Sequence, residues 1–146
     1  MALKRIRSHG ERTGAERTDV TIRRHRFTLD EPVAAGGTDT APTPLEYVVG
    51  ALNGCVTVLV DLVAADLGIT VEHVVTDAVA EQDRAGIAGV PGVRTHFSSV
   101  RLDVRVTSSA DAEQLEALAA EVERRCPMVN LLRDAHVEVD VVWSAA

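Results

Sequence analysis

The sequence predicts one α+β domain over residues 1–146, and three observations lead to this fold class. Apolar residues make up 46% of the chain, which is sufficient for a hydrophobic core. Alternating segments typical of strands surround helical segments in an irregular order: strands, a long helix, strands, a helix, a short helix and a strand. The chain has no internal repeat and no regular strand–helix–strand alternation, which excludes a doubly wound sheet.

The N-terminal part of the chain is predicted to be extended. Residues 1–17 are polar and irregular, and we expect an arm or a weak strand there. Apolar and polar residues alternate over residues 19–29, which predicts a strand near the edge of a sheet. Residues 30–42 contain two adjacent glycines and two prolines, a composition typical of a loop.

A long helix is predicted from Thr43 to about Leu67. Thr43 is a favourable N-cap, and Glu46 completes a capping box. Gly68 is a suitable C-terminal stop. Apolar residues cover most of the circumference of this helix, so we expect it to be central and buried. One small sheet cannot cover so much apolar surface, whereas a homodimer that shares its helices would cover it.

Three strands are predicted in the second half of the chain, over residues 71–81, 100–106 and 137–143, because apolar residues alternate with polar ones there. Residues 83–93 contain three glycines and a proline and predict a mobile loop.

Two helices are predicted between the last two strands. Residues 111–125 place their leucines and valines on one face and predict an amphipathic helix. Pro127 suits a first helical position, so we expect a short helix over residues 127–132 with Cys126 as its cap.

The composition excludes several classes of function. The net charge is −7 and there is no concentrated basic patch, which argues against nucleic acid as a partner. No apolar stretch follows the basic N-terminus, and the longest apolar run contains Asp61, so neither a secretory signal nor a membrane span is expected. We therefore expect a cytoplasmic protein, in which a permanent disulfide is disfavoured and a transient catalytic one is permitted.

No metal and no cofactor are expected. The histidines are scattered and none of them is close to paired cysteines. The adjacent glycines lack the spacing and the lysine of a phosphate-binding loop. The histidines are His9, His25, His73, His96 and His136.

The two cysteines, Cys55 and Cys126, are the candidates for chemistry. Peroxide reduction by a thiol needs a thiolate, a cation that lowers its pKa and a second thiol that resolves the sulfenic acid. Cys55 lies on an apolar face of its helix, so a cation from elsewhere is required to lower its pKa. Cys126 lies at a helix N-terminus, where the helix dipole favours the thiolate. The alternative is that both cysteines are small buried packing residues. The chain has no Cys-x-x-Cys motif, which excludes a thioredoxin-like site.

Glu46 cannot reach Cys55 of its own chain if the helix is continuous. Nine residues of helix correspond to about 13 Å of rise and about 180° of rotation. Glu46 therefore either serves the capping box alone or orients an arginine at a site on a partner chain.

Several motifs resemble the OsmC/Ohr family, which comprises osmotically inducible protein C, the organic hydroperoxide resistance proteins and their relatives. The resemblance runs from about residue 19 to residue 143. The motifs are Asp30-Glu31-Pro32, Gly36-Gly37-Thr38-Asp39, Pro42-Thr43-Pro44-Leu45-Glu46, Gly50-Ala51-Leu52-Asn53-Gly54-Cys55, and Arg125-Cys126-Pro127-Met128 with Leu131-Leu132.

This resemblance implies an intertwined homodimer, with the long central helix and the second helix packed against antiparallel sheets. It implies a thiol peroxidase that reduces organic hydroperoxides, with Cys55 as the peroxidatic and Cys126 as the resolving thiol. The reductant would be a dithiol such as dihydrolipoamide or its protein carrier.

The resemblance also implies an arginine that activates the thiolate and a glutamate that holds this arginine, both from the other subunit. Arg24 is the first candidate, followed by Arg23 and Arg26, and the glutamate is Glu46. Typical peroxidases of the family place the glutamate one residue further from the cysteine, so the spacing here is more similar to the OsmC-like branch.

Two other functions are consistent with the residues. The first is a non-catalytic OsmC-like dimer that binds a small apolar ligand in the same interfacial pocket. The second is another thiol enzyme, such as a disulfide reductase, which is disfavoured because no second cysteine lies near either thiol in the sequence.

Overall fold

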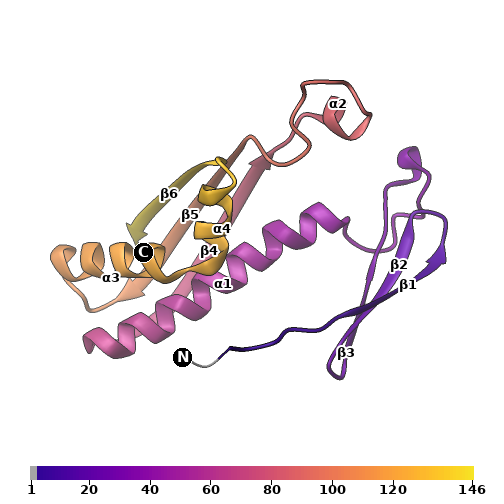
Figure 1. Ribbon diagram of the computed structural model, residues 1–146. Coiled ribbons are helices and arrows are strands. Elements are labelled where there is room, and N and C mark those ends of the chain that lie inside the picture. The colour runs from indigo at the N-terminus through magenta and orange to yellow at the C-terminus, as the bar shows by residue number, and fades with distance from the viewer. Residues whose placement is uncertain (1–2) are drawn as a thin grey trace. The chain divides into compact units, whose positions relative to one another are not determined.

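The computed structural model describes residues 3–146. The chain forms two compact units, Met1–Val48 and Val49–Ala146, and the long helix α1 (Pro44–Leu67) contains the boundary between them (Figure 1). The single domain expected over residues 1–146 stays a prediction. The α+β class is confirmed, since each unit contains a three-stranded sheet and the helices follow in the expected order.

The first unit contains an antiparallel sheet of three strands, β1 (His9–Gly14), β2 (Arg17–Ile22) and β3 (His25–Leu29). The single strand expected over residues 19–29 is therefore wrong in its extent. Arg23 has a φ of 57° and forms the tight turn that separates β2 from β3. This left-handed conformation is unusual for a non-glycine residue and is not visible in the alternation of apolar and polar residues.

The loop after β3 is organised by a buried carboxylate, Asp30, whose side chain is 0% exposed. The backbone N–H groups of Glu31, Thr38 and Thr40 and the hydroxyls of both threonines donate hydrogen bonds to this carboxylate. These bonds favour the charged form and hold the pKa of Asp30 far below its ordinary value, with the Thr38 hydroxyl as the largest cause. The short 3-10 helix η1 (Val33–Ala35) lies within this loop.

The helix α1 begins and ends where the capping signals predict. The backbone N–H of Thr43 donates to the Glu46 carboxylate at 2.7 Å, and the Glu46 N–H donates to the Thr43 hydroxyl at 3.3 Å. Gly68 follows the last helical residue with a φ of 68°, which only glycine adopts without strain.

The second unit contains the other sheet, with the order β4 (Val71–Glu81), β5 (Ser99–Ser108), β6 (Glu138–Ala145). β4 and β5 are antiparallel as expected, whereas β5 and β6 are parallel. The parallel pairing arises because two helices lie between β5 and β6 in the chain and return it to the same end of the sheet. The predicted loop over residues 83–93 contains one short helix, α2 (Arg84–Ile87).

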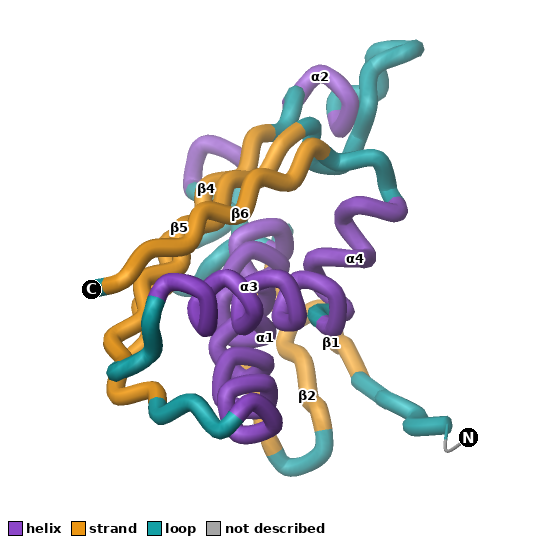
Figure 2. The backbone as a smooth tube through the Cα atoms, turned by 90° about the vertical axis from the view of Figure 1, so that its left-hand side faces the viewer, coloured by secondary structure: helices purple, strands orange, loops and turns teal. Residues whose placement is uncertain are grey.

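The helices α3 (Ala112–Arg125) and α4 (Pro127–Asp134) follow one another with a single residue, Cys126, between them. α3 lies beside the second-unit part of α1, and α4 turns away from α3 at this junction (Figure 2). The core of the unit combines alternate residues of β5 with one face of each helix. Its fully buried side chains include Val56, Val60, Val63, Val100, Leu102, Val104, Leu118, Val122 and Val129.

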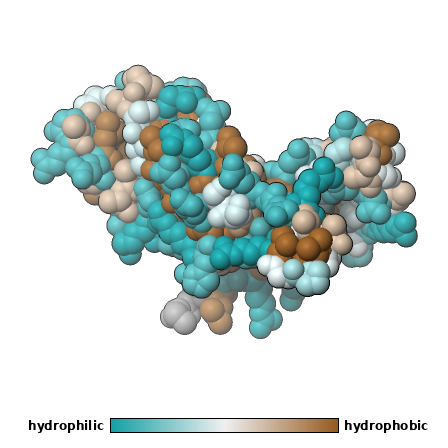
Figure 3. All heavy atoms as spheres, turned by 90° about the horizontal axis from the view of Figure 1, so that it is seen from above, coloured by the Kyte–Doolittle hydropathy of each residue, from teal (hydrophilic) through white to brown (hydrophobic). Residues whose placement is uncertain are grey.

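Within its unit, α1 is buried on one face only. Val58, Leu62 and Leu67 on its other side are 55%, 51% and 45% exposed. The face of the molecule in Figure 3 likewise shows hydrophobic patches within a largely hydrophilic surface. By length and composition alone α1 would suit a membrane span, but core helices of soluble proteins meet the same criterion.

Candidate functional site

The structure brings Cys55 and Cys126 into contact. Cys55 lies in the middle of α1 and Cys126 between α3 and α4, and their sulfur atoms are 3.5 Å apart. Both thiols are free. The Cys126 side chain is fully buried, whereas that of Cys55 is partly exposed. The sulfur–sulfur distance in a disulfide is about 2.05 Å, so two-electron oxidation together with a displacement of about 1.5 Å would join them.

The backbone fixes the position of Cys126. Its N–H donates to the Val122 carbonyl at 2.8 Å, as the last bond of α3, and its carbonyl accepts the N–H of Asn130 at 3.1 Å, as the first bond of α4. The neighbouring Arg125 forms an ion pair with Asp66 of α1 at 2.6 Å. The junction is therefore attached to the helix that carries Cys55.

Burial raises the pKa of the Cys55 thiol above its ordinary value, and the adjacent Cys126 thiol raises it further. The backbone N–H of Met128, in the first turn of α4, donates to the Cys55 sulfur and lowers the pKa. No basic side chain of residues 49–146 contributes to this pKa. Within this unit Cys55 is therefore protonated at neutral pH, and its activation requires a cation from outside the unit.

The other predicted site residues lie in the first unit. Arg24 is exposed in the turn between β2 and β3, next to Arg23, and Arg26 is 3.8 Å from Asp19. Glu46 forms the capping box, and the Thr43 backbone N–H is the main cause of its lowered pKa. Since Glu46 and Cys55 belong to one continuous helix, the distance argument made from the sequence applies. The catalytic roles of Arg24 and Glu46 stay predictions.

Arg17 was not among the predicted site residues. Its guanidinium donates to the Thr40 hydroxyl at 2.6 Å and lies 4.0 Å from the Asp30 carboxylate, so it belongs to the polar cluster of the loop. An aspartate followed by two threonines after the glycine pair is a pattern that favours hydrogen bonds to a carboxylate, but it does not identify the arginine that joins them.

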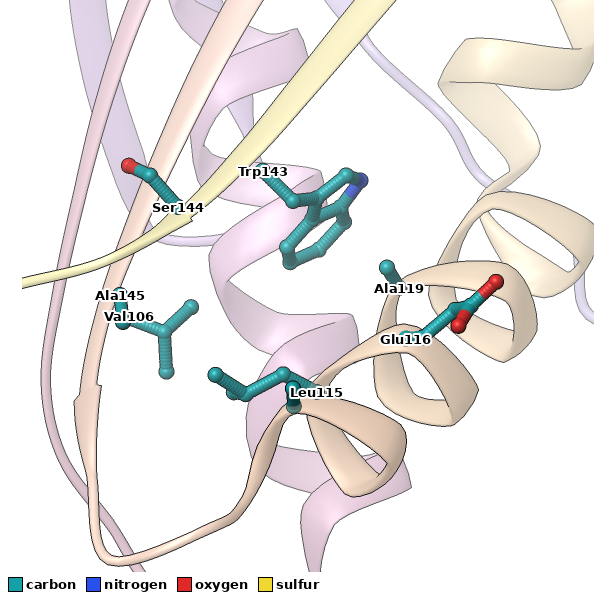
Figure 4. A pocket seen from close by; sticks show the side chains of 8 residues that line it. Val106, Leu115, Glu116, Ala119, Trp143, Ser144 and Ala145 are labelled. Atoms are coloured by element: carbon teal, nitrogen blue, oxygen red, sulfur yellow. The ribbon is translucent and has the colours of Figure 1, made fainter.

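A separate cavity of about 450 Å³ lies in the second unit, between α3 and the end of β6. Figure 4 shows the Trp143 ring and Leu115 beside it, with the Glu116 carboxylate nearby. Neither cysteine lines this cavity. Its walls are mainly apolar, so it would suit a small apolar molecule rather than an anion.

Residues 37–142 match the family model of the OsmC-like proteins. The chain belongs to the OsmC family. The match contains both cysteines and Glu46 and ends before the last residues of β6. No curated protein is matched significantly by the sequence.

Solved structures of OsmC-like proteins share this fold. An OsmC-like protein from Mycoplasma pneumoniae has a TM-score of 0.85 at 15% identity, with 98% of each chain covered. An organic hydroperoxide resistance protein from Elizabethkingia anophelis, with thiocyanate bound, has a TM-score of 0.78 at 18% identity and 99% coverage of each chain.

A third similar structure is an OsmC organic hydroperoxide resistance protein from Legionella pneumophila, which is also described as a predicted redox protein and regulator of sulfide bond formation. Its TM-score is 0.70 at 20% identity, with 100% of this chain and 99% of that chain covered. At these identities the likeness establishes the OsmC fold.

Proposed function

We propose that this OsmC-family protein is a thiol peroxidase that reduces organic hydroperoxides with Cys55 and Cys126. The observation that supports this most strongly is the 3.5 Å separation of the two sulfur atoms, which belong to residues far apart in the sequence. A structural role in packing would not require the sulfurs to face one another. Membership of a family with organic hydroperoxide resistance proteins among its similar structures also favours this chemistry.

The reaction takes place in two steps. The Cys55 thiolate attacks the terminal peroxide oxygen, the O–O bond breaks, and the alkoxide leaves as an alcohol after taking one proton; Cys55 becomes a sulfenic acid. The Cys126 sulfur then attacks the Cys55 sulfur, a disulfide forms, and the hydroxyl leaves as water with the Cys126 proton. A dithiol such as dihydrolipoamide, free or on a protein carrier, reduces the disulfide and becomes oxidised.

The activating cation is proposed to come from a second copy of the chain. Burial raises the pKa of Cys55, and residues 49–146 supply no basic side chain to oppose this. An arginine of the first unit, Arg24 or one of its neighbours Arg23 and Arg26, would supply the charge with Glu46 as its partner. This assignment requires a homodimer, which would also cover the exposed apolar side of α1.

The substrate is proposed to be an organic rather than an inorganic peroxide. Val58 and Leu62 follow Cys55 by about one and two helical turns and are 55% and 51% exposed, so apolar side chains on the same side of α1 are available to a substrate. An alkyl or aryl group gains free energy on leaving water to contact these side chains, whereas hydrogen peroxide has no such group.

The test is intact-mass analysis after one equivalent of cumene hydroperoxide is added to the reduced protein, with a thiol alkylator as quench. We expect a loss of about 2 Da and two thiols protected from alkylation, because each disulfide removes two hydrogens. The Cys126→Ser protein should instead gain about one oxygen, or react further with the reagent.

Two freely alkylated and unoxidised thiols in the wild-type protein would contradict the peroxidase. Repeating the measurement with hydrogen peroxide tests the substrate class, because equal or faster oxidation would contradict the preference for organic peroxides.

A second candidate function, binding of a small apolar ligand, is favoured by the cavity beside Trp143. Trp143 is the only tryptophan of the chain, so its fluorescence reports on this cavity alone. We expect a neutral, non-fluorescent apolar probe such as cyclohexanol to change the Trp143 emission saturably, and Leu115→Glu to weaken this binding about tenfold or more, because it places a charge on the apolar wall. A linear, unsaturable response would contradict a binding site.

A further inference from the structure

Asn130, in the second turn of α4, holds the junction that contains Cys126. Its side-chain amide nitrogen lies 3.2 Å from the Glu123 carbonyl oxygen, 3.1 Å from that of Arg124 and 2.9 Å from that of Cys126. The Glu123 and Arg124 carbonyls belong to the last turn of α3, where a helix leaves its carbonyl groups without intrahelical donors, whereas the Cys126 carbonyl also accepts the Asn130 backbone N–H.

The chain has a specific need for this amide. In a continuous helix the Glu123 carbonyl would accept the N–H of residue 127, but Pro127 has no N–H. At Cys126 the backbone leaves the helical conformation, with a ψ of 112°, so α3 does not continue past this residue. Asn130 therefore supplies a donor to the Glu123 and Arg124 carbonyls at this break.

We propose that Asn130 is a positioning residue of the thiol pair, whose side-chain amide satisfies the end of α3 and so keeps the Cys126 sulfur and the first turn of α4 beside Cys55. This proposal rests on the proposed redox function of the two cysteines. It assigns to one side chain the control of two contacts, the one that forms the disulfide and the one that stabilises the Cys55 thiolate.

Removing the amide should release the junction. In Asn130→Ala the Glu123 and Arg124 carbonyls lose this donor, so the first turn of α4 is no longer held to the end of α3 by the amide and can move away from Cys55. The Cys55 thiolate would lose a hydrogen bond, and the Cys126 sulfur would no longer be held at 3.5 Å. Both changes slow oxidation, and neither requires unfolding.

The first measurement is the dithiol–disulfide equilibrium of the full-length protein in mixtures of reduced and oxidised dithiothreitol. The two S–H bonds of the cysteines are exchanged for one S–S bond, while the cyclic disulfide of the reagent becomes a dithiol. We expect Asn130→Ala to lower the equilibrium constant for disulfide formation about three- to tenfold, because a junction that is no longer held presents the Cys126 sulfur to Cys55 at a lower effective concentration.

The second measurement is the pH dependence of Cys55 alkylation by iodoacetamide in a Cys126→Ser background. We expect Asn130→Ala to move this profile to higher pH, because the Met128 N–H no longer stabilises the thiolate. Asn130→Ser should restore part of both effects, since a serine hydroxyl can donate to the carbonyl four residues earlier, that of Cys126.

Gln114→Ala is the matched control. Gln114 also has an amide side chain that bonds to the backbone at a helix end, but it belongs to the capping box at the N-terminal end of α3. It should lower the melting temperature without changing the equilibrium constant or the alkylation profile.

If Asn130→Ala gives wild-type values in both measurements, the proposal is overturned and Asn130 is a structural cap only. If Asn130→Ala does not fold, the same two measurements are made on Asn130→Ser. A partial shift of the equilibrium constant and of the alkylation profile supports the proposal, and wild-type values overturn it. The dithiothreitol equilibrium needs no peroxide, so a wild-type protein that is inert to cumene hydroperoxide would contradict the peroxidase and leave the role of Asn130 testable.

Discussion

The Cys55→Ser protein is expected to lose turnover of organic hydroperoxides by a factor of about 10³ or more, because a serine hydroxyl is a far weaker nucleophile than a thiolate. The partly exposed position and the similar size of serine leave the fold intact. The measurement is steady-state consumption of cumene hydroperoxide with dihydrolipoamide as the reductant.

The matched control is Cys126→Ser, which removes the other thiol of the same pair. It should retain the first oxidation of Cys55 in a single turnover and lose the disulfide step. Turnover by Cys55→Ser within a few-fold of the wild-type rate would exclude Cys55 as the nucleophile. In that case the two sulfurs would be packing residues.

Asp30→Ala is expected to lower the melting temperature by on the order of 10 °C, because it removes a buried carboxylate that accepts five hydrogen bonds from the loop. The direct measurement is amide hydrogen exchange at Thr38 and Thr40, whose N–H groups donate to the Asp30 carboxylate at 3.1 and 3.0 Å. Both amides should lose their protection.

The control for this change is Asp39→Asn in the same loop. Asp39 has a φ of 54°, which asparagine tolerates, and among the described residues its side chain accepts no hydrogen bond. Asp39→Asn should leave the exchange of Thr38 and Thr40 unchanged. Equal protection of these amides in Asp30→Ala would mean that the loop is held by other contacts.

The same carboxylate gives the loop a pH dependence with a defined sign. The folded pKa of Asp30 lies far below its ordinary value of 3.8. The group therefore contributes its full stability above about pH 4, and this contribution is lost as the pH falls from there towards the folded pKa. Asp30→Ala should remove this part of the acid dependence.

The helices were predictable because their signals are local. The capping box of Thr43 and Glu46 and the positive φ of Gly68 set the limits of α1, and Pro127 sets the start of α4. The alternating segments likewise predicted β4, β5 and β6 to within two residues at most ends. The OsmC family was also predicted, from motifs around both cysteines.

The other features of the fold and the site were not predicted from the alternation of apolar and polar residues. Four consecutive basic residues separate Val20 and Ile22 from Phe27 and Leu29, and the alternation changes phase across them, so the expectation of one strand overlooked the turn at Arg23. The parallel pairing of β5 with β6 is set by the path of α3 and α4. The roles of Asp30 and Asn130 depend on which backbone groups lack partners, and this becomes visible only when the loop and the junction are folded.

Cys55 and Cys126 are separated by 71 positions in the chain, so their bond would close a large covalent ring. Such a ring restricts the unfolded chain far more than the folded one, and by the chain-entropy relation it favours the folded state by roughly 4 kcal/mol. The ring joins the middle of α1 to the point where α3 ends. Oxidation would therefore stabilise the fold reversibly, and the protein would be most resistant to unfolding after an oxidant has formed the bond and before a reductant has broken it.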